Sequence, residues 1–285
     1  MQRPTTMAEP DLSGFGVQEI RRVARVTVVV LWCVLRSTAR AIVRRRPLGA
    51  AAADGVIDGF IELGPTFVKL GQVMASSSGI FPAWLAAPAR RCLDEVPPFP
   101  AEVVRATISD DLGAPMAELF ASFDDVPLSA ASIGQVHACE LHDGRQAVVK
   151  VQRPGLRHAM TRDLRVLHGV AVLAQRTRWG RSANALGMVA DLNRLTAQEL
   201  NPALEAWYQQ RFRDQLRAFG DNLHITAPEV YWDHCGRHTI CMERVHGIPM
   251  DDFEGIAARG IDGQLVLRRG AKAWAEAVLV HGPFH

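Results

Sequence analysis

The stretch QAVVKVQRPG, residues 146–155, decides how this chain is interpreted. Its β-branched residues predict a strand over 146–151 that carries Lys150 near its end, and Pro154 with Gly155 stops that strand. Lys150 is one of three lysines among 32 basic residues, and the others are arginine. Because lysine offers a compact charge on a flexible stem, its retention here indicates a site that needs a point charge. The alternative is a strand-end lysine that only reaches solvent.

The segments around this strand predict an α+β fold. Residues 132–141 form a preceding strand, and His142-Asp143-Gly144 form the turn between the two. After the lysine strand, hydrophobic periodicity predicts helices over 158–175 and 188–219, strands over 228–232 and 237–242, and a last helix over 263–281.

The first 125 residues are predicted to be mostly helical. We expect a loose tail over 1–17, a basic amphipathic helix over 18–49, and a helix over 50–74 that breaks at Gly64-Pro65. Residues 81–100 place prolines around one short helix, and 101–123 predict two helices that separate near residues 113–115.

Strand, turn, lysine strand, helix with glutamate and two further strands follow the order of a protein-kinase small lobe. In such a lobe the ammonium at the strand end contacts the α and β phosphates of ATP, while a helical carboxylate holds it in place. We therefore expect an antiparallel sheet with an αC-like helix, preceded by a helical extension. The expected units are the tail, the basic helix, the extension over 50–125, the small lobe over 126–246 and the start of a large lobe over 247–285.

Four motifs in this order resemble the UbiB/AarF family of atypical kinase-like proteins. Residues 67–72, FVKLGQ, resemble the KxGQ signature of that family, and residues 93–100, LDEVPPFP, resemble the connector that follows it. Residues 129–137, SAASIGQVH, resemble its alanine-rich loop, and Lys150 within VVKVQRPG matches its strand lysine. The similarity runs from about residue 50 to the last residue and includes several ordered motifs.

The resemblance implies an atypical kinase or ATPase that binds ATP or ADP and supports isoprenoid-quinone or lipid metabolism, often at a membrane. Small residues in the alanine-rich loop let backbone N–H groups approach phosphates, and only Gly134 offers free φ; a plain β-turn is the alternative. Backbone groups after residue 242 can contact adenine, unless this is an ordinary strand exit. The expected nucleotide-binding residues are Ala130, Ala131, Ser132, Gly134, Lys150, Glu205, Glu243 and Val245.

The resemblance also assigns Lys69, Gly71 and Gln72 to a regulatory segment that folds over the nucleotide site and is linked to an E-x-D motif. That motif corresponds here to Glu199 and Asn201, so the second acid is replaced by an uncharged amide. We expect one helix to serve both lysines, with positions 201 and 205 on one face and 199 pointing away. The alternative is that these are solvated helix residues.

Four possible metal ligands, His234, Cys235, His238 and Cys241, lie within eight residues. Gly236 in their middle indicates a hairpin turn, and side chains on two alternating strands would not converge on one ion. We therefore predict no metal site here.

The chain contains neither D-F-G nor H-R-D, the motifs that supply the magnesium-binding and catalytic acids of kinases. The family's catalytic loop would begin at His285, so we expect a truncated large lobe and no catalytic residue in these 285 positions. We accordingly expect no turnover, and Mg²⁺ only in a full-length form.

Charge and composition limit the partners. The net charge is +2, and a run over 21–46 contains eight arginines. This basic helix could pack Val28, Leu31, Val34 and Leu35 on its own protein, or it could contact an anionic membrane surface. Only Trp32 interleaves with those arginines, so nucleic acid is not expected. The apolar run over 26–35 is too short to span a bilayer, which needs about 20 residues. Five scattered cysteines and no secretory leader predict a cytoplasmic protein, or one that is peripheral at the inner face of the cell membrane.

A second interpretation stays open beside the enzymatic one. The chain could work as a non-catalytic module that binds a membrane surface or a protein partner, such as a protein of quinone biosynthesis or lipid metabolism, through its basic helix and the KxGQ segment.

Overall fold

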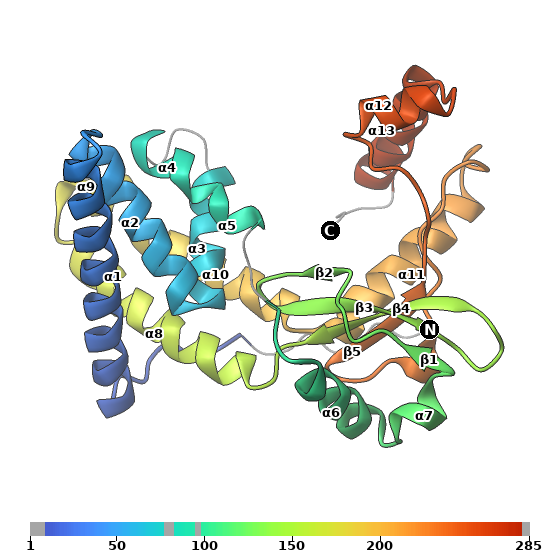
Figure 1. Cartoon of the computed structure of the whole chain (residues 1–285), viewed down its shortest axis with the longest axis horizontal. Coiled ribbons are helices and arrows are strands. Elements are labelled where there is room, and N and C mark those ends of the chain that lie inside the picture. Colours follow the sequence, from blue (N-terminus) through green and yellow to red (C-terminus); the bar gives the residue numbers. More distant parts are fainter. Residues whose placement is uncertain (1–8, 77–82, 95–97, 281–285) are drawn as a thin grey trace.

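The computed structural model of the chain describes residues 9–76, 83–94 and 98–280. A helical region and an antiparallel sheet lie side by side, at the left and lower right of Figure 1. The helical region consists of α1 (Val17–Val43), α2 (Leu48–Leu63), α3 (Pro65–Ser76), α4 (Ala83–Ala89), α5 (Arg91–Asp94), α8 (Leu156–Ala174), α9 (Arg178–Ser182) and α10 (Ala185–Glu199).

The sheet and the helices around it form the second region. The strands are β1 (Ser122–Phe123), β2 (Ser129–Ala130), β3 (Gly134–Glu140), β4 (Gln146–Gln152) and β5 (Thr239–Glu243). Around them lie α6 (Ala101–Leu112), α7 (Met116–Leu119), α11 (Pro202–Ala218) and a 3-10 turn (Trp232–His234). Beyond the sheet, α12 (Phe253–Ala258) and α13 (Gly263–Leu279) lie at the upper right of Figure 1.

The helical extension and its expected breaks are confirmed. The predicted interruption at Gly64-Pro65 separates α2 from α3, because Gly64 adopts a φ of 103° and Pro65 begins the next helix. Residues 9–16, which were predicted to be loose, instead contact the helices. The carbonyl oxygen of Pro10 accepts from Asn193 at 3.2 Å, and that of Asp11 accepts from Arg165 at 2.9 Å.

The sheet has the strand order β1-β3-β4-β5, with β2 paired to the other end of β3. The predicted hairpin joins β3 to β4, and Gly144 in its turn has a φ of 85° that suits glycine. The register pairs Lys150 with Val136 on one side and with Ile240 on the other. Lys150 therefore lies in the middle of a three-strand stretch.

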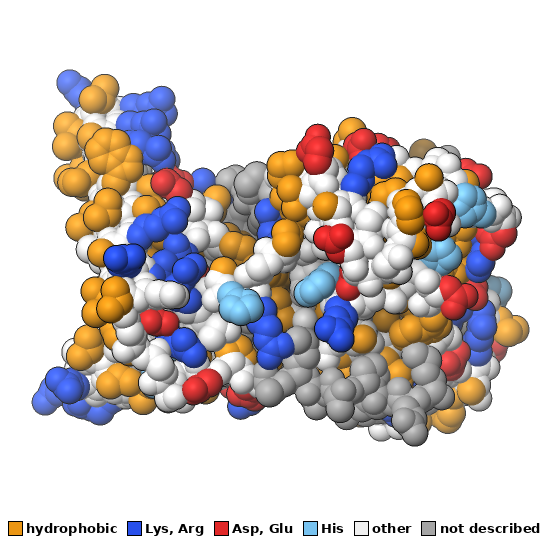
Figure 2. All heavy atoms as spheres, turned by 90° about the horizontal axis from the view of Figure 1, so that it is seen from below, with side chains coloured by type: hydrophobic (Ala, Val, Ile, Leu, Met, Phe, Trp, Pro, Cys, Tyr) orange, Lys and Arg blue, Asp and Glu red, His pale blue; other side chains and the backbone are white. Residues whose placement is uncertain are grey.

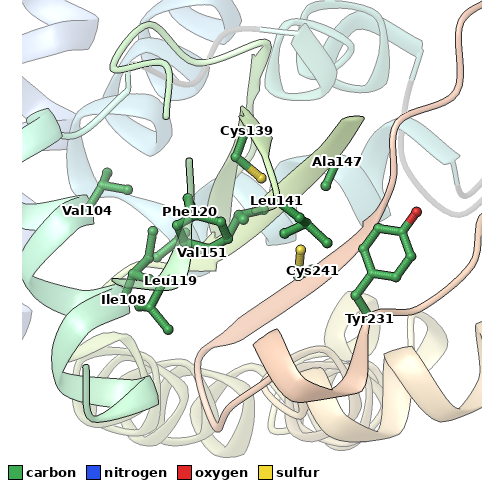
Figure 3. Packing of buried hydrophobic residues seen from close by; sticks show 11 residues of the cluster. Val104, Ile108, Leu119, Phe120, Cys139, Leu141, Ala147, Val151, Tyr231 and Cys241 are labelled. Carbon is green, nitrogen blue, oxygen red and sulfur yellow. The ribbon is translucent and has the colours of Figure 1, made fainter. Parts of the chain in front are cut away.

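Alternation along β4 separates two faces of the sheet. Ala147, Val149 and Val151 are completely buried in a core against α6 and α7, which Figure 3 shows with contributions from β3 and β5. Lys150 lies between Val149 and Val151 and so points to the opposite face, where α11 packs against β5. The strand pattern thus places the lysine on the face that α11 covers.

Three predicted elements are wrong. The one short helix expected within 81–100 is two helices, α4 and α5. The helix expected over 188–219 is two helices, because α10 ends at Glu199 and α11 begins at Pro202. The strand expected over 228–232 is reduced to a single bridge between Val230 and Met242, followed by the 3-10 turn.

Candidate nucleotide-binding site

Lys150 and Glu205 form the centre of the candidate site. The ammonium nitrogen of Lys150 lies 2.5 Å from Oε1 of Glu205, which stands in the first turn of α11. Their side chains are 26% and 40% exposed, so the pair lies at the edge of the protein interior and can be reached by a solute. A carboxylate hydrogen-bonded to an ammonium limits its rotation. The structure contains the pair that the sequence predicted.

A second lysine–glutamate pair reaches the same pocket through its glutamate. Lys69 in α3 forms an ion pair with Glu199, the last residue of α10. Lys150, Glu199 and Glu205 all line one small pocket, which is completed by Ile133, Gly134, Gln152, Pro202, His238 and Ile240. The KxGQ segment is thus joined through Glu199 to the cavity that contains the strand lysine.

The break between α10 and α11 makes this arrangement possible. Proline disfavours helical φ and ψ at the residue before it, so Asn201 cannot continue α10 into Pro202. The side chain of Asn201 is buried and accepts a hydrogen bond from the Leu204 N–H at 3.2 Å, which caps α11. Because the chain turns here, Glu199 and Glu205 reach one cavity. The expectation that position 199 points away from 205 on a single helix is wrong.

Asn201 therefore has a role that sequence reasoning missed. The signal in the sequence is the pair Asn201-Pro202, because Asn caps helices and Pro is common at their first position. A cap needs only a hydrogen-bond acceptor, so the lost charge leaves this function intact.

The alanine-rich loop is a tight hairpin between β2 and β3. The Ala131 N–H donates to the Gly134 carbonyl at 2.7 Å, so it serves the turn. The Ser132 side chain is buried, and Ala130 pairs with Gln135 in the sheet. Ala131 is thus unsuited to donate its N–H to a phosphate, whereas Gly134 lines the pocket.

Gly134 is needed for a different reason than we predicted. Six glycines of the described residues have a positive φ, and Gly134 is not one of them. A Cβ at this position would overlap with the carbonyl oxygen of Val151, so close packing of β3 on β4 requires glycine here.

The segment after β5 is held by backbone and side-chain contacts. The Glu243 N–H donates to the Glu229 carbonyl at 2.8 Å and is not available to adenine. Val245 is 64% exposed. The carbonyl of Glu243 and the backbone of Val245 remain the groups that we expect to contact a base.

Gly71 and Gln72 face the interior of the extension. Gln72 Nε2 donates to the Cys92 carbonyl at 3.0 Å, and a Cβ at position 71 would overlap with the Cys92 sulfur. These two residues fix α3 to α5, while Lys69 alone of the three reaches Glu199.

A buried polar chain was missed entirely. The Gln135 side chain accepts from the Phe99 N–H at 2.9 Å, donates to the Phe99 carbonyl at 3.1 Å and lies 2.9 Å from Nε2 of His137. Nδ1 of His137 lies 2.8 Å from the Asp124 carbonyl oxygen. Because Gln135 directs its amide nitrogen at Nε2, that atom accepts and Nδ1–H donates. These hydrogen bonds attach the connector before α6 to the loop before β2.

The four possible zinc ligands have separate partners. His234 lies 3.1 Å from the Leu119 carbonyl oxygen, and His238 lies 3.1 Å from Oε1 of Gln152. A hydrogen bond with Cys139 and burial raise the pKa of the Cys241 thiol, which favours the protonated form over a metal ligand. Within residues 9–76, 83–94 and 98–280, no group of three or more His, Cys, Asp or Glu side chains could hold a metal ion.

Several predicted features are covered only in part. Residues 1–8 of the tail, residues 81–82 and 95–97 of the segment over 81–100, residue 281 of the last helix, and His285, the expected start of the catalytic loop, lie outside the described residues.

An antiparallel sheet with a central lysine paired to a helical glutamate defines a kinase-like small lobe. The family model of the ABC1 atypical kinase-like domain matches residues 91–285, and the chain belongs to this family. The resemblance to UbiB-type proteins is therefore confirmed.

Relatives support the same assignment. An uncharacterized protein of Mycobacterium tuberculosis is 37% identical over 257 residues, which cover 89% of this chain and 53% of that protein. A probable protein kinase UbiB of Marinobacter nauticus is 34% identical over 79% of this chain and 41% of its own length. Protein ACTIVITY OF BC1 COMPLEX KINASE 7, chloroplastic, of Arabidopsis thaliana is 34% identical over 85% of this chain and 34% of its own length. The chain spans about half the length, or less, of these curated relatives.

A solved structure of a Mycobacterium tuberculosis protein in complex with erythromycin is 34% identical, covering 59% of this chain and 40% of that one with a TM-score of 0.47.

Proposed function

We propose that the chain binds ATP or ADP through Lys150, as the small lobe of a UbiB-like atypical kinase or ATPase. The observation that carries this proposal is the Lys150–Glu205 pair at a pocket that Glu199 also lines. An ammonium fixed by one carboxylate keeps two further N–H bonds for phosphate oxygens, and preorganised positive charge is what phosphoryl chemistry requires.

The pocket offers a nucleotide one cation and a stretch of closely approached backbone. Lys150 supplies the cation for the α and β phosphates, and Gly134 at the pocket wall has no side chain to obstruct them. The adenine would lie against the Glu243 carbonyl and the Val245 backbone, further along β5. Lys69 and Glu199 connect the extension to this site, which supports a regulatory role for the KxGQ segment.

Catalytic turnover needs motifs that nucleotide binding does not need. The 285 residues contain no D-F-G or H-R-D sequence to hold Mg²⁺ and to orient an attacking hydroxyl. We therefore propose that these residues bind nucleotide without measurable hydrolysis, and that Mg²⁺ is required only in a longer form. Service to isoprenoid-quinone or lipid metabolism is supported by relatives that carry the name UbiB.

Calorimetric titration with ADP tests the binding proposal. Lys150→Ala should lower the affinity by about 10- to 100-fold, because a hydrogen bond to a charged group contributes about 1.5–3 kcal/mol. Lys272→Ala is the matched control, since Lys272 lies on α13 and pairs with Glu276 at 3.5 Å. Equal affinities for the two variants would refute the assignment of Lys150. Phosphate release that needs both Mg²⁺ and Lys150 would refute the expected lack of turnover.

A second function is favoured by one surface. α1 is 27 residues long, and most of its apolar surface is exposed. By length and composition it could cross a membrane, so the expectation that its apolar run is too short is corrected. Its outward face carries Val28, Leu31, Leu35 and Ile42, which are 56–66% exposed.

Charge flanks this apolar face. Arg22 and Arg36 pair with Asp163 and Asp58, but the arginines at 44–46 are exposed at the end of α1. Figure 2 shows hydrophobic and basic side chains gathered at its left edge, the side on which Figure 1 places α1. We propose that this surface contacts anionic lipid at the inner face of the cell membrane, with the rest of the chain in the cytoplasm.

Co-sedimentation with phosphatidylglycerol vesicles tests this contact. Binding should survive Lys150→Ala and fail when Arg44, Arg45 and Arg46 are changed to glutamine. The reverse pattern would contradict the lipid contact.

A further inference from the structure

We propose that Arg213 is a positioning residue that fixes the adenine-contacting segment 243–245 relative to α11 and thereby gives the site its preference for adenine. The inference rests on the nucleotide site proposed above. It concerns a side chain that no sequence motif singled out.

Arg213 is buried near the C-terminal end of α11. Its side chain is 10% exposed, and its guanidinium donates to the Thr226 hydroxyl at 3.3 Å and to the carbonyl oxygen of Ala227. The same group lies 3.2 Å from Oε2 of Glu243 and 3.8 Å from Oε2 of Glu229. A buried arginine with this many acceptors is fixed in orientation by its planar fork.

Glu243, which forms the ion pair with Arg213, is the first residue of the segment expected to contact the base. Its carboxylate also accepts from the Glu229 N–H at 3.0 Å, and its own N–H donates to the Glu229 carbonyl at 2.8 Å. The next residue, Arg244, donates its N–H to the Gln146 carbonyl of β4 at 3.1 Å. Among the side chains and backbone groups that hold Glu243 and Arg244, that of Arg213 comes from α11. Arg213 therefore links this helix to the segment 243–245.

α11 therefore contacts the sheet through two charged side chains. Glu205 in its first turn holds Lys150 of β4, and Arg213 eight residues later holds Glu243 of β5. Each pair fixes its own end of the site: Glu205 holds the lysine at the phosphate end, and Arg213 holds the segment at the base end.

The consequence is chemical selectivity. Adenine offers an amino donor and a ring acceptor where guanine offers a carbonyl acceptor and a ring donor. A backbone carbonyl and N–H held at fixed positions accept the first pattern and reject the second, because a mismatched base leaves polar groups unpaired. Release of Glu243 weakens this discrimination.

Titrations of the full chain with ADP, GDP and pyrophosphate test the proposal. Arg213→Gln should lower ADP affinity by about tenfold, the size of one lost hydrogen-bonding contribution, while leaving GDP and pyrophosphate affinities unchanged. The ADP:GDP affinity ratio should fall by the same factor. Arg211→Gln is the matched control, because that guanidinium lies over the Trp207 ring on the same helix, 5.2 Å from its centroid.

Glu243→Gln provides a second variant in case Arg213→Gln does not unfold cooperatively, and it should give the same fall in the ratio. An unchanged ratio in the folded variant, or a wild-type chain that binds ADP and GDP equally through Lys150, would overturn the role of Arg213 and leave the nucleotide site standing. Lys150→Ala should weaken all three ligands. If none of them binds in a Lys150-dependent way, the nucleotide site itself is refuted.

Discussion

Two ion pairs, one in the helical region and one beside the sheet, differ in burial and in the number of hydrogen bonds. Arg22 of α1 meets Asp163 of α8 through two hydrogen bonds of 2.6 and 2.9 Å, and it also donates to the Leu63 carbonyl. Its side chain and that of Asp163 are 10% and 4% exposed. Lys150 and Glu205 share one 2.5 Å contact and are 26% and 40% exposed.

The difference separates a structural pair from a binding pair. Arg22 uses its planar fork on acceptors of the protein and lies over the Phe67 ring. Lys150 has one protein carboxylate and borders a pocket, so part of its hydrogen-bonding capacity can serve a solute. Burial, more than the presence of a salt bridge, distinguishes the two roles.

The largest expected effect comes from breaking the buried pair. Arg22→Met should lower the free energy of unfolding by about 3–5 kcal/mol, because Asp163 is left buried without a counter-charge. Urea denaturation measures this loss, and ADP affinity should be unchanged under folding conditions. Arg22→Met combined with Asp163→Leu should recover most of the stability. A single variant that loses less than about 1 kcal/mol would show that the pair is not desolvated.

A backbone contact in the sheet gives the next largest effect. Gly134→Ala should cost about 1–3 kcal/mol, because the new Cβ meets the Val151 carbonyl and forces β3 away from β4. It should also lower ADP affinity, since Lys150 is on β4.

Gly55→Ala is the matched change in the helical region. Its Cβ would lie 2.6 Å from Cα of Val34, so it should push α1 from α2 at a similar cost. Binding of ADP should be retained in this variant. Equal effects of the two changes on ADP affinity would contradict the separation of the regions.

The helix cap between the two glutamates has a smaller effect. Asn201→Ala should cost about 1 kcal/mol through loss of the hydrogen bond to the Leu204 N–H, and should weaken ADP binding because Glu205 is in the turn that the cap orders. Asn201→Asp should preserve thermal stability, since Asp caps as well as Asn. Asn184→Ala, which removes the cap of α10, controls for stability alone and should leave the ADP affinity unchanged.

The smallest effect on stability is expected for the residue with the largest effect on binding. Lys150→Ala should change the free energy of unfolding by less than about 1 kcal/mol, because partly exposed ion pairs contribute little. Urea denaturation without nucleotide measures this change. A loss of several kcal/mol would indicate that Lys150, like Arg22, is structural.

The sequence was most informative where one residue has a local effect. Gly64-Pro65 ends a helix whatever surrounds it, and a strand pattern with Lys150 fixes the face to which that side chain points. Family motifs then supplied the partner Glu205, which no local rule could select from the acids of the chain.

Sequence reasoning failed where the decisive contact is tertiary. The Asn201-Pro202 break was passed over because hydrophobic periodicity continues on both sides of it. The partners of Gln135 and Arg213 are carbonyls and side chains distant along the chain, and a single polar residue carries no sign of such partners. The same holds for Gly134, whose constraint comes from a neighbouring strand.

Three lysines make the central claim directly measurable. In a chain labelled with ¹³C at lysine Cε, only Lys69, Lys150 and Lys272 give signals, which single Lys→Arg variants assign. On addition of ADP we predict the largest chemical-shift change at Lys150, a smaller one at Lys69 through Glu199, and none at Lys272. Unmoved signals from Lys150 and Lys69, or equal movement of all three, would contradict a shared nucleotide site at these two residues.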